Sequence, residues 1–242
     1  MKPLGGIKTG LRLLGFGMGL VGLLPAYGAA PPTAKPPKES ATPVAAATAY
    51  RTEVALSVDK IGSQETALGG LVADALREAA HADAAFIPAA SFRSDASAIS
   101  PGSFNPNDVV QMLDFRSETI AVVKLTGAQI RRALAHAFLL YPQENSSFLQ
   151  FSGLTVTIEP NAEEQGRIVS VRIGGQPLVD NQTYRVAMPL TLANGALAYF
   201  KYWDKSDIVQ TLDTTLEQAI KSYLKTHPVI TKGEDRLVEN GS

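Results

Sequence analysis

Strand-like and helix-like segments alternate irregularly between residues 50 and 226, and this order constrains the fold more than any other feature. Apolar or β-branched runs with the two-residue period of strands occupy residues 50–58, 84–87, 118–125, 154–158, 168–173 and 184–188. Apolar residues at helical spacing predict four helices: from Ser63 to about Ala80, from Asn105-Pro106, from Thr126-Gly127 to a stop at Pro142, and from Thr214 to Lys225. We therefore expect an α/β (α+β) fold, a mixed-sheet α/β sandwich, rather than an all-β or helix-bundle architecture.

The N-terminus has the pattern of an export signal. Lys2, Lys8 and Arg12 precede an apolar stretch at residues 13–24, which ends at small residues. This stretch is shorter than the roughly 20 apolar residues that a membrane span needs. We interpret residues 1–28 as a signal peptide, with an uncleaved N-terminal anchor as the alternative, and expect a periplasmic or extracellular protein. Residues 29–49 are rich in Pro and Ala and predict an extended linker, which leaves residues 50–242 as the folded domain.

The composition limits both the cross-links and the partners of such a domain. The chain has no cysteine, so the core must hold an exported domain without disulfides. Without the three cations of the leader, 19 of the 22 Lys and Arg remain against 23 Asp and Glu, a formal charge of −4. This balance disfavours a nucleic-acid polymer or an anionic membrane surface as partner. We expect a small molecule instead, and no membrane span after signal cleavage.

The sequence contains none of the usual patterns of a catalytic centre. Metal-dependent hydrolases carry D-x-H, H-x-H or related clusters, whereas His81, His136 and His227 are isolated in this sequence. There is no thiol, no G-x-S-x-G motif and no phosphate-binding P-loop. Asp114 with Glu118 could be cast as a carboxylate pair, although acidic residues in loops are usually just solvated. We therefore predict no catalytic residue, no metal site and no cofactor.

A series of short motifs carries a resemblance to a known family. In order, the motifs are "ETALGGLVADALREAAHADAAFI", "FRS", "MLDF", "AVVKLTGAQIRRALAHA", "FLQFSGLTVTI", "GRIVSVRIGGQPL" and "TYRVAMPLTLANG". They cover about residues 50–226, and the string resembles the C-terminal domain of secreted 5′-nucleotidases and UDP-sugar hydrolases. The resemblance implies a nucleoside-holding domain of nucleotide catabolism, whose hydrolysis is performed by a separate N-terminal metallophosphoesterase domain with two metals. Residues 1–49 are too short to encode that second domain.

The resemblance also indicates three candidate ligand-binding residues. Arg93 in "FRS" matches the arginine of the family motif N-G-G-G-I-R, and Phe115 in "LDF" matches the first of two rings that sandwich the base. Asn194 matches the first residue of the family motif N-G-G-D-G. Each has a structural alternative, since Phe115 could be core, Arg93 could pair with Asp95 or Asp114, and Asn194-Gly195 could be only a turn.

The chain departs from the family at several of the same motifs. Residues 88–91, Pro-Ala-Ala-Ser, replace Asn-Gly-Gly-Gly, so that Cβ atoms crowd the place where a ligand would approach the backbone. Thr191 stands where the second ring is expected, and Leu197 where an aspartate usually holds the ribose. Lys60 is the only cation where the family often places phosphate-binding arginines. A cluster of rings could replace the missing one or simply pack: Tyr199, Phe200, Tyr202 and Trp203.

Two functions remain open on these grounds. The first is an exported, stand-alone 5′-nucleotidase C-terminal-like domain that binds a nucleotide, a nucleoside or another small polar ligand. Its partner would be a separately encoded metallophosphoesterase, because the resemblance is to a hydrolase family but we expect no catalysis by this domain alone. The second is a non-catalytic protein-interaction or structural module whose nucleoside pocket has degenerated.

Overall fold

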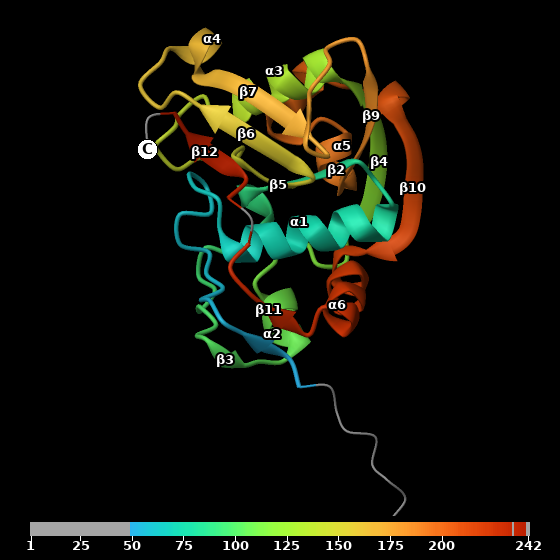
Figure 1. The fold of residues 1–242 in the computed structure, drawn as a ribbon. Coiled ribbons are helices and arrows are strands. Elements are labelled where there is room, and N and C mark those ends of the chain that lie inside the picture. The colour runs from blue at the N-terminus through green and yellow to red at the C-terminus, as the bar shows by residue number, and fades with distance from the viewer. Residues whose placement is uncertain (1–48, 234, 241–242) are drawn as a thin grey trace, which may run out of the picture. The chain divides into compact units, whose positions relative to one another are not determined.

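The computed structural model describes residues 49–233 and 235–240 (Figure 1). The predicted signal peptide, residues 1–28, lies outside the described residues, as does the predicted linker apart from Ala49. In the described part of the chain, no helix combines the length and the apolar character that crossing a membrane would require.

A mixed five-stranded sheet forms the centre of the fold, in the order β10-β4-β9-β2-β5. Strands β2 and β9 run parallel, and the other three pairings are antiparallel. The strands are β2 (Ala84–Pro88), β4 (Thr119–Thr126), β5 (Leu149–Ser152), β9 (Thr183–Pro189) and β10 (Ile208–Thr215). The expected mixed α/β class is confirmed.

The central sheet is buried on both faces because its strands alternate their apolar side chains between two cores. Phe86 and Val123 belong to one core, whereas Ile87 and Val122 belong to the other. Three helices cover the second face: α1 (Ala67–Ala80), α2 (Pro106–Gln111) and α6 (Leu216–Thr226). Figure 1 shows α1 between the central sheet and the pair formed by α2 and α6.

The first face is covered by α3 (Gly127–Ala137) and by a four-stranded sheet in the order β12-β6-β7-β8. The strands of this sheet are β6 (Leu154–Ile158), β7 (Ile168–Ile173), β8 (Gln176–Pro177) and β12 (Leu237–Glu239). A small third sheet joins β1 (Arg51–Thr52), β3 (Gly102–Ser103) and β11 (Val229–Ile230). The short helices are α4 (Glu164–Arg167), α5 (Leu190–Ala193), η1 (Ala89–Ser91), η2 (Ala196–Lys201) and η3 (Lys205–Asp207).

Several predicted boundaries were wrong for local reasons. Helix α1 is capped by Thr66, whose hydroxyl accepts from Gly69 N at 3.0 Å, whereas Ser63 is buried in the preceding turn. The strand predicted at residues 50–58 is a strand only at Arg51–Thr52, with one further bridge from Leu56 to Ile99, because the Thr52 hydroxyl donates to Val54 O at 2.6 Å and bends the chain. The closing helix starts at Leu216, since Thr214 still belongs to β10. Helix α3 already ends at Ala137, before Pro142.

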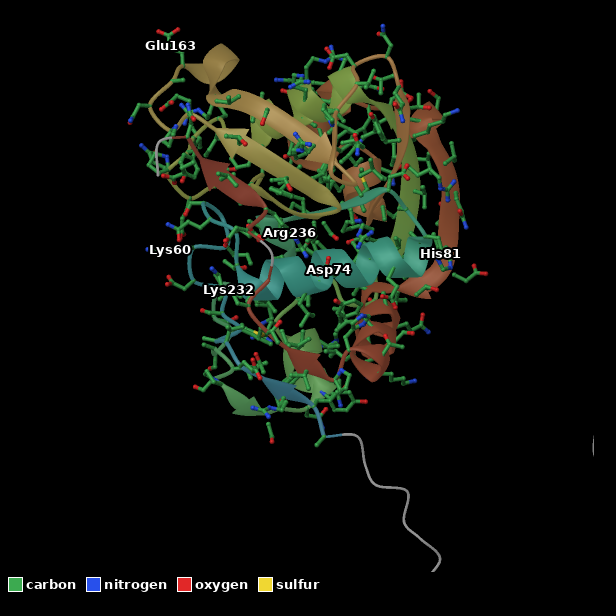
Figure 2. All side chains as sticks on the ribbon, viewed as in Figure 1. Lys60, Asp74, His81, Glu163, Lys232 and Arg236 are labelled. Carbon is green, nitrogen blue, oxygen red and sulfur yellow. The ribbon has the colours of Figure 1, made fainter. Side chains whose placement is uncertain are left out.

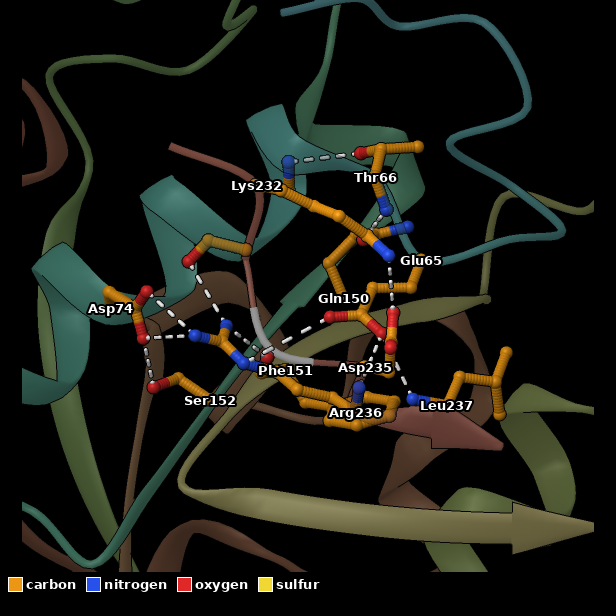
Figure 3. Close-up of polar contacts among 12 residues, drawn as sticks. Glu65, Thr66, Asp74, Gln150, Phe151, Ser152, Lys232, Asp235, Arg236 and Leu237 are labelled. Carbon is orange, nitrogen blue, oxygen red and sulfur yellow. Dashed lines mark hydrogen bonds and ion pairs between the residues drawn. The ribbon is translucent and has the colours of Figure 1, made fainter. Parts of the chain in front are cut away.

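A buried ion pair fastens the C-terminal segment to α1 (Figure 3). The guanidinium of Arg236 donates to both carboxylate oxygens of Asp74, at 2.9 and 2.8 Å, and also to Phe151 O at 3.1 Å. Ser152 Oγ donates to the same Asp74 carboxylate. The Glu65 carboxylate accepts from the backbone N–H groups of Arg236 and Leu237. The network therefore joins α1, β5 and β12, elements that are far apart in sequence.

Candidate ligand-binding site

The order of the central sheet gathers the predicted site segments at one of its edges. Strands β2 and β9 are parallel, so their carboxyl ends, Pro88 and Pro189, lie at the same edge. Strand β4 is antiparallel to β9, with Ile120 opposite Pro189, so the residues before β4 also lie there. The turn with Arg93, the turn with Phe115 and the segment with Asn194 are three of the connections at this edge. The topology thus brings three sequence-distant motifs to one face.

The turn after β2 has no glycine because its backbone needs none. Residues 89–91 form the short 3₁₀ helix η1, and no residue between 82 and 101 has a positive φ. The N–H of Ala89 donates to Phe148 O at 2.8 Å, and that of Ala90 donates to Ser146 O at 3.0 Å. These two backbone donors are therefore consumed by the segment before β5, and this turn does not present them to a ligand.

Arg93 lies next to this turn and is held by an acidic neighbour. Its Nε and Nη2 donate to the two carboxylate oxygens of Asp95 at 3.1 and 2.9 Å. Through this hydrogen bond and the opposite charge, the guanidinium lowers the pKa of the Asp95 carboxyl. Both side chains are solvent-accessible, so an anionic ligand can compete for the guanidinium at small cost. The arginine is thus paired with Asp95 in this structure, and a ligand anion could take the place of that carboxylate.

Phe115 projects from the second turn into solvent. Its ring is 61% exposed, so the alternative that Phe115 is core is wrong. The turn itself is ordered, because Asp114 N donates to Ser91 O at 3.0 Å and Glu118 N donates to Phe115 O at 2.9 Å. The Glu118 carboxylate then accepts from Thr191 N at the start of α5. An exposed ring is therefore held on a turn that is bonded to both neighbouring segments.

The third segment carries Asn194 and an unusual turn. Asn194 is exposed and ends α5, and Gly195 follows with φ 90°. Leu197 and Ala198 both have positive φ, 56° and 67°, which costs about 1–3 kcal/mol for each residue that is not glycine. His136 stabilises this turn by donating from Nε2 to Leu197 O at 2.9 Å.

The four rings that follow have different environments. Tyr199 and Trp203 are buried and stacked, with centroids 4.9 Å apart, and Tyr202 packs against His136. Phe200 differs from them, because its ring is 65% exposed. Three of the four rings thus have packing roles, and Phe200 is the one of this cluster whose ring is presented to solvent.

A cavity of about 600 Å³ adjoins the first turn. It is lined by residues 57–62, by Ala89, Ala90 and Phe92, and by residues 144–146. Lys60 is exposed on this wall and has a positive φ of 58°. Figure 2 shows Lys60 on the loop before α1. Lys60, the only cation that the sequence offers for a phosphate in the segment before α1, therefore lines a cavity beside the Arg93 turn.

The three histidines lie apart on different helices. His81 and His227 end α1 and α6, and His136 supports the Leu197 turn. Across residues 49–233 and 235–240, no group of three or more His, Cys, Asp or Glu side chains is arranged to hold a metal ion.

Comparison with known proteins assigns the chain to a family. The model of the 5′-nucleotidase C-terminal domain matches residues 43–202. The chain belongs to this family. A 5′-nucleotidase-related protein of Glossina morsitans morsitans is 28% identical over 211 residues, 77% of this chain and 37% of the relative. The 5′-nucleotidase of Vibrio parahaemolyticus is 28% identical over 176 residues, 73% of this chain and 30% of the relative.

The fold of this 5′-nucleotidase C-terminal domain agrees with a solved structure. The 5′-nucleotidase precursor of Thermus thermophilus superposes with a TM-score of 0.69 at 23% identity, over 80% of this chain and 39% of that one. The chain therefore spans about a third of the length of these proteins.

Two positioning residues of the domain could not be found from the sequence. Glu118 bonds Thr191 across 73 residues, and His136 bonds Leu197 across 61 residues. Neither pair has a local motif, because both contacts depend on which strands are neighbours in the sheet. From the sequence, Glu118 can be interpreted only as one half of a carboxylate pair with Asp114. His136 can be interpreted only as a residue of an amphipathic helix.

Proposed function

We propose that this protein is an exported ligand-binding domain that holds a nucleoside or nucleotide at the face around Phe115 and has no hydrolytic centre of its own. The observation that carries the proposal is the Phe115 ring, which is 61% exposed on a turn tied to η1 and α5. A ring that an ordered turn holds in water offers a face on which a base can stack. The family match and the relatives named 5′-nucleotidase support a nucleoside base as its partner.

The rest of the face supplies polar groups suited to such a ligand. Arg93 offers a planar fork for a phosphate once Asp95 is displaced. The side-chain amide of Asn194 is solvent-exposed, and Lys60 lines the adjoining cavity. Leu197 cannot accept a hydrogen bond from a sugar, so we expect weaker binding than a site with a carboxylate there. One missing polar contact of this kind costs about 1–3 kcal/mol.

Hydrolysis is assigned to a separate chain. The three histidines lie apart on different helices, which supports a domain that binds without cleaving. A separately encoded metallophosphoesterase would supply the reacting centre, and the leader-like residues 1–28 support export to the compartment where the two meet.

Calorimetric titration of the purified protein with adenosine, AMP and UDP-glucose tests the binding proposal. We expect at least one of the three to bind, and Phe115→Ala to weaken that binding about tenfold or more, because the base loses its stacking partner. Val209→Ala is the matched control, since Val209 is 48% exposed on β10 near the opposite end of the sheet. Equal affinities of the wild type and Phe115→Ala would contradict the proposal.

One observation favours the alternative of an interaction module. The N–H groups of Ala89 and Ala90 donate to carbonyl groups of the protein, and Arg93 is paired with Asp95. Part of the hydrogen-bonding capacity of this face is therefore already used within the protein. In that case Phe115 would contact a protein partner instead. Absence of all nucleoside binding, together with capture of a defined envelope protein that is lost in Phe115→Ala, would favour this second function.

A further inference from the structure

A second and larger cavity, of about 1030 Å³, lies along the solvent side of α1. Its walls come from α1, the end of α6, the β5–β6 junction and the C-terminal segment at residues 229–239. None of its lining residues belongs to the turns of Arg93 and Phe115, to the Asn194 segment or to the 600 Å³ cavity. It is therefore a separate site candidate, and its function does not depend on the proposed nucleoside face.

The floor of this cavity is built from charges that are already satisfied. Asp74 and Arg236, labelled in Figure 2, form the bidentate pair described above. The Ser152 hydroxyl donates a further hydrogen bond to the Asp74 carboxylate (Figure 3). Lys232 pairs with Asp235 at 3.2 Å, but both side chains are exposed to solvent. Burying charges such as Asp74 and Arg236 is costly, so their pair adds little net stability over an apolar floor, but it gives the cavity a rigid polar base.

Three groups on the walls are not satisfied in this way. Arg77 uses Nε to donate to Ser152 Oγ at 2.8 Å, while its two Nη atoms have no hydrogen bond to any described residue. The hydroxyl of Tyr223 has no partner within residues 49–233 and 235–240 either. The Glu78 carboxylate makes no hydrogen bond to a described residue, and His227 lies beside it, with the ring Nδ1 at 3.9 Å. The cavity thus presents two free Nη groups of a guanidinium, a carboxylate without a hydrogen bond and a hydroxyl, with the His227 ring beside that carboxylate.

These groups lie on one stretch of the cavity wall. Arg77 and Glu78 are neighbours on α1, and the Glu78 carboxylate lies 3.9 Å from the ring Nδ1 of His227. The ring of Tyr223 is fixed by stacking on His227, with centroids 4.1 Å apart and planes at 15°. Burial raises the pKa of Tyr223 to about 12, so the hydroxyl is a neutral donor at physiological pH.

The free charges indicate the chemistry of the occupant. Arg77 and Glu78, a cation and an anion that both keep free hydrogen-bonding atoms in the lining, match a ligand that carries one group of each sign. A multiply charged anion is disfavoured, because the remaining acidic side chains of the lining, Glu65, Asp83, Asp235 and Glu239, outnumber its only remaining lysine, Lys232. We propose that the α1 cavity binds a small zwitterion with one carboxylate and one ammonium group, such as a free α-amino acid. Arg77 and Tyr223 donate to the carboxylate, and Glu78 accepts from the ammonium group.

Thermal-shift and calorimetric measurements on the full chain test this proposal. The probes are the standard α-amino acids. The control compounds are acetate, which has only the carboxylate, methylamine, which has only the ammonium group, and glycerol, which has neither. We expect at least one amino acid to bind at millimolar concentration, and the three partial compounds not to bind. Tyr223→Phe and Glu78→Gln should each weaken that binding about tenfold, the loss expected when one charge-assisted or buried hydrogen bond is removed.

Matched variants separate this site from the other one. Glu53→Gln is the control for Glu78→Gln, because Glu53 is also exposed and also has a basic side chain 3.9 Å away, that of Arg51. It should bind the amino acid as the wild type does, and so should Phe115→Ala. The proposal is overturned if no amino acid binds, if acetate or glycerol binds as well as the amino acids, or if Tyr223→Phe and Glu78→Gln, folded by circular dichroism, bind unchanged.

Discussion

At the scale of single residues, the buried pair of Asp74 and Arg236 has the clearest consequence for stability. Only 8% of the Arg236 side chain and 19% of the Asp74 side chain are exposed, so the guanidinium depends on its carboxylate partner. Asp74→Asn leaves a buried charge without that partner, and we expect the free energy of unfolding to fall by about 3–5 kcal/mol in urea titrations. Asp95→Asn, which breaks the solvent-exposed pair with Arg93, should leave it unchanged. Equal stability of both variants would show that the network does not fasten the C-terminal segment.

At the scale of elements, α3 is positioned by its first turn. The N–H groups of Gly127 and Ala128 donate to Gln182 O and Asp180 O, at 2.9 and 3.1 Å, which satisfies donors that a helix start leaves free. A Cβ at position 127 would lie 2.2 Å from Val179 O. Gly127→Ala should therefore lower the free energy of unfolding by about 1–3 kcal/mol. Gly233→Ala, whose Cβ would meet open space, should change it by less than about 0.5 kcal/mol.

The four predicted helices are present and start within a few residues of the predicted positions, whereas some strands were missed. Asn105-Pro106 and Thr126-Gly127 carry their own start signals, and α2 and α3 begin there. Strand β10 was missed because it is an edge strand, partly or fully exposed along its whole length, and therefore shows little apolar alternation. Strand β5 was missed because its four residues are all buried and give no two-residue period. A two-residue period appears in the sequence only where a strand is buried on one face. Strands that are buried on both faces, or exposed on both, cannot be recognised by this period.

At the scale of the whole molecule, the candidate ligand-binding residues could be predicted from the sequence, but not the fact that the fold brings their segments together on one face. Arg93, Phe115 and Asn194 came from short motifs, and the sheet order places their segments at one edge. The partners that fix this face, Glu118 and His136, act across strand neighbours and have no linear signal. The chain also spans only about a third of its relatives. We expect the purified protein with Mg²⁺ or Mn²⁺ to release no phosphate from AMP, and metal-dependent release that EDTA abolishes would contradict the assignment of hydrolysis to another chain.

The amide NMR spectrum of the full chain, recorded during a titration with adenosine, tests the central claim most directly. The account predicts shifts that cluster in residues 88–95, 113–118 and 190–200, and that disappear in Phe115→Ala. Shifts confined to the α1 cavity around Tyr223, or no shifts at saturating adenosine, would contradict the claim that the Phe115 face is the nucleoside site.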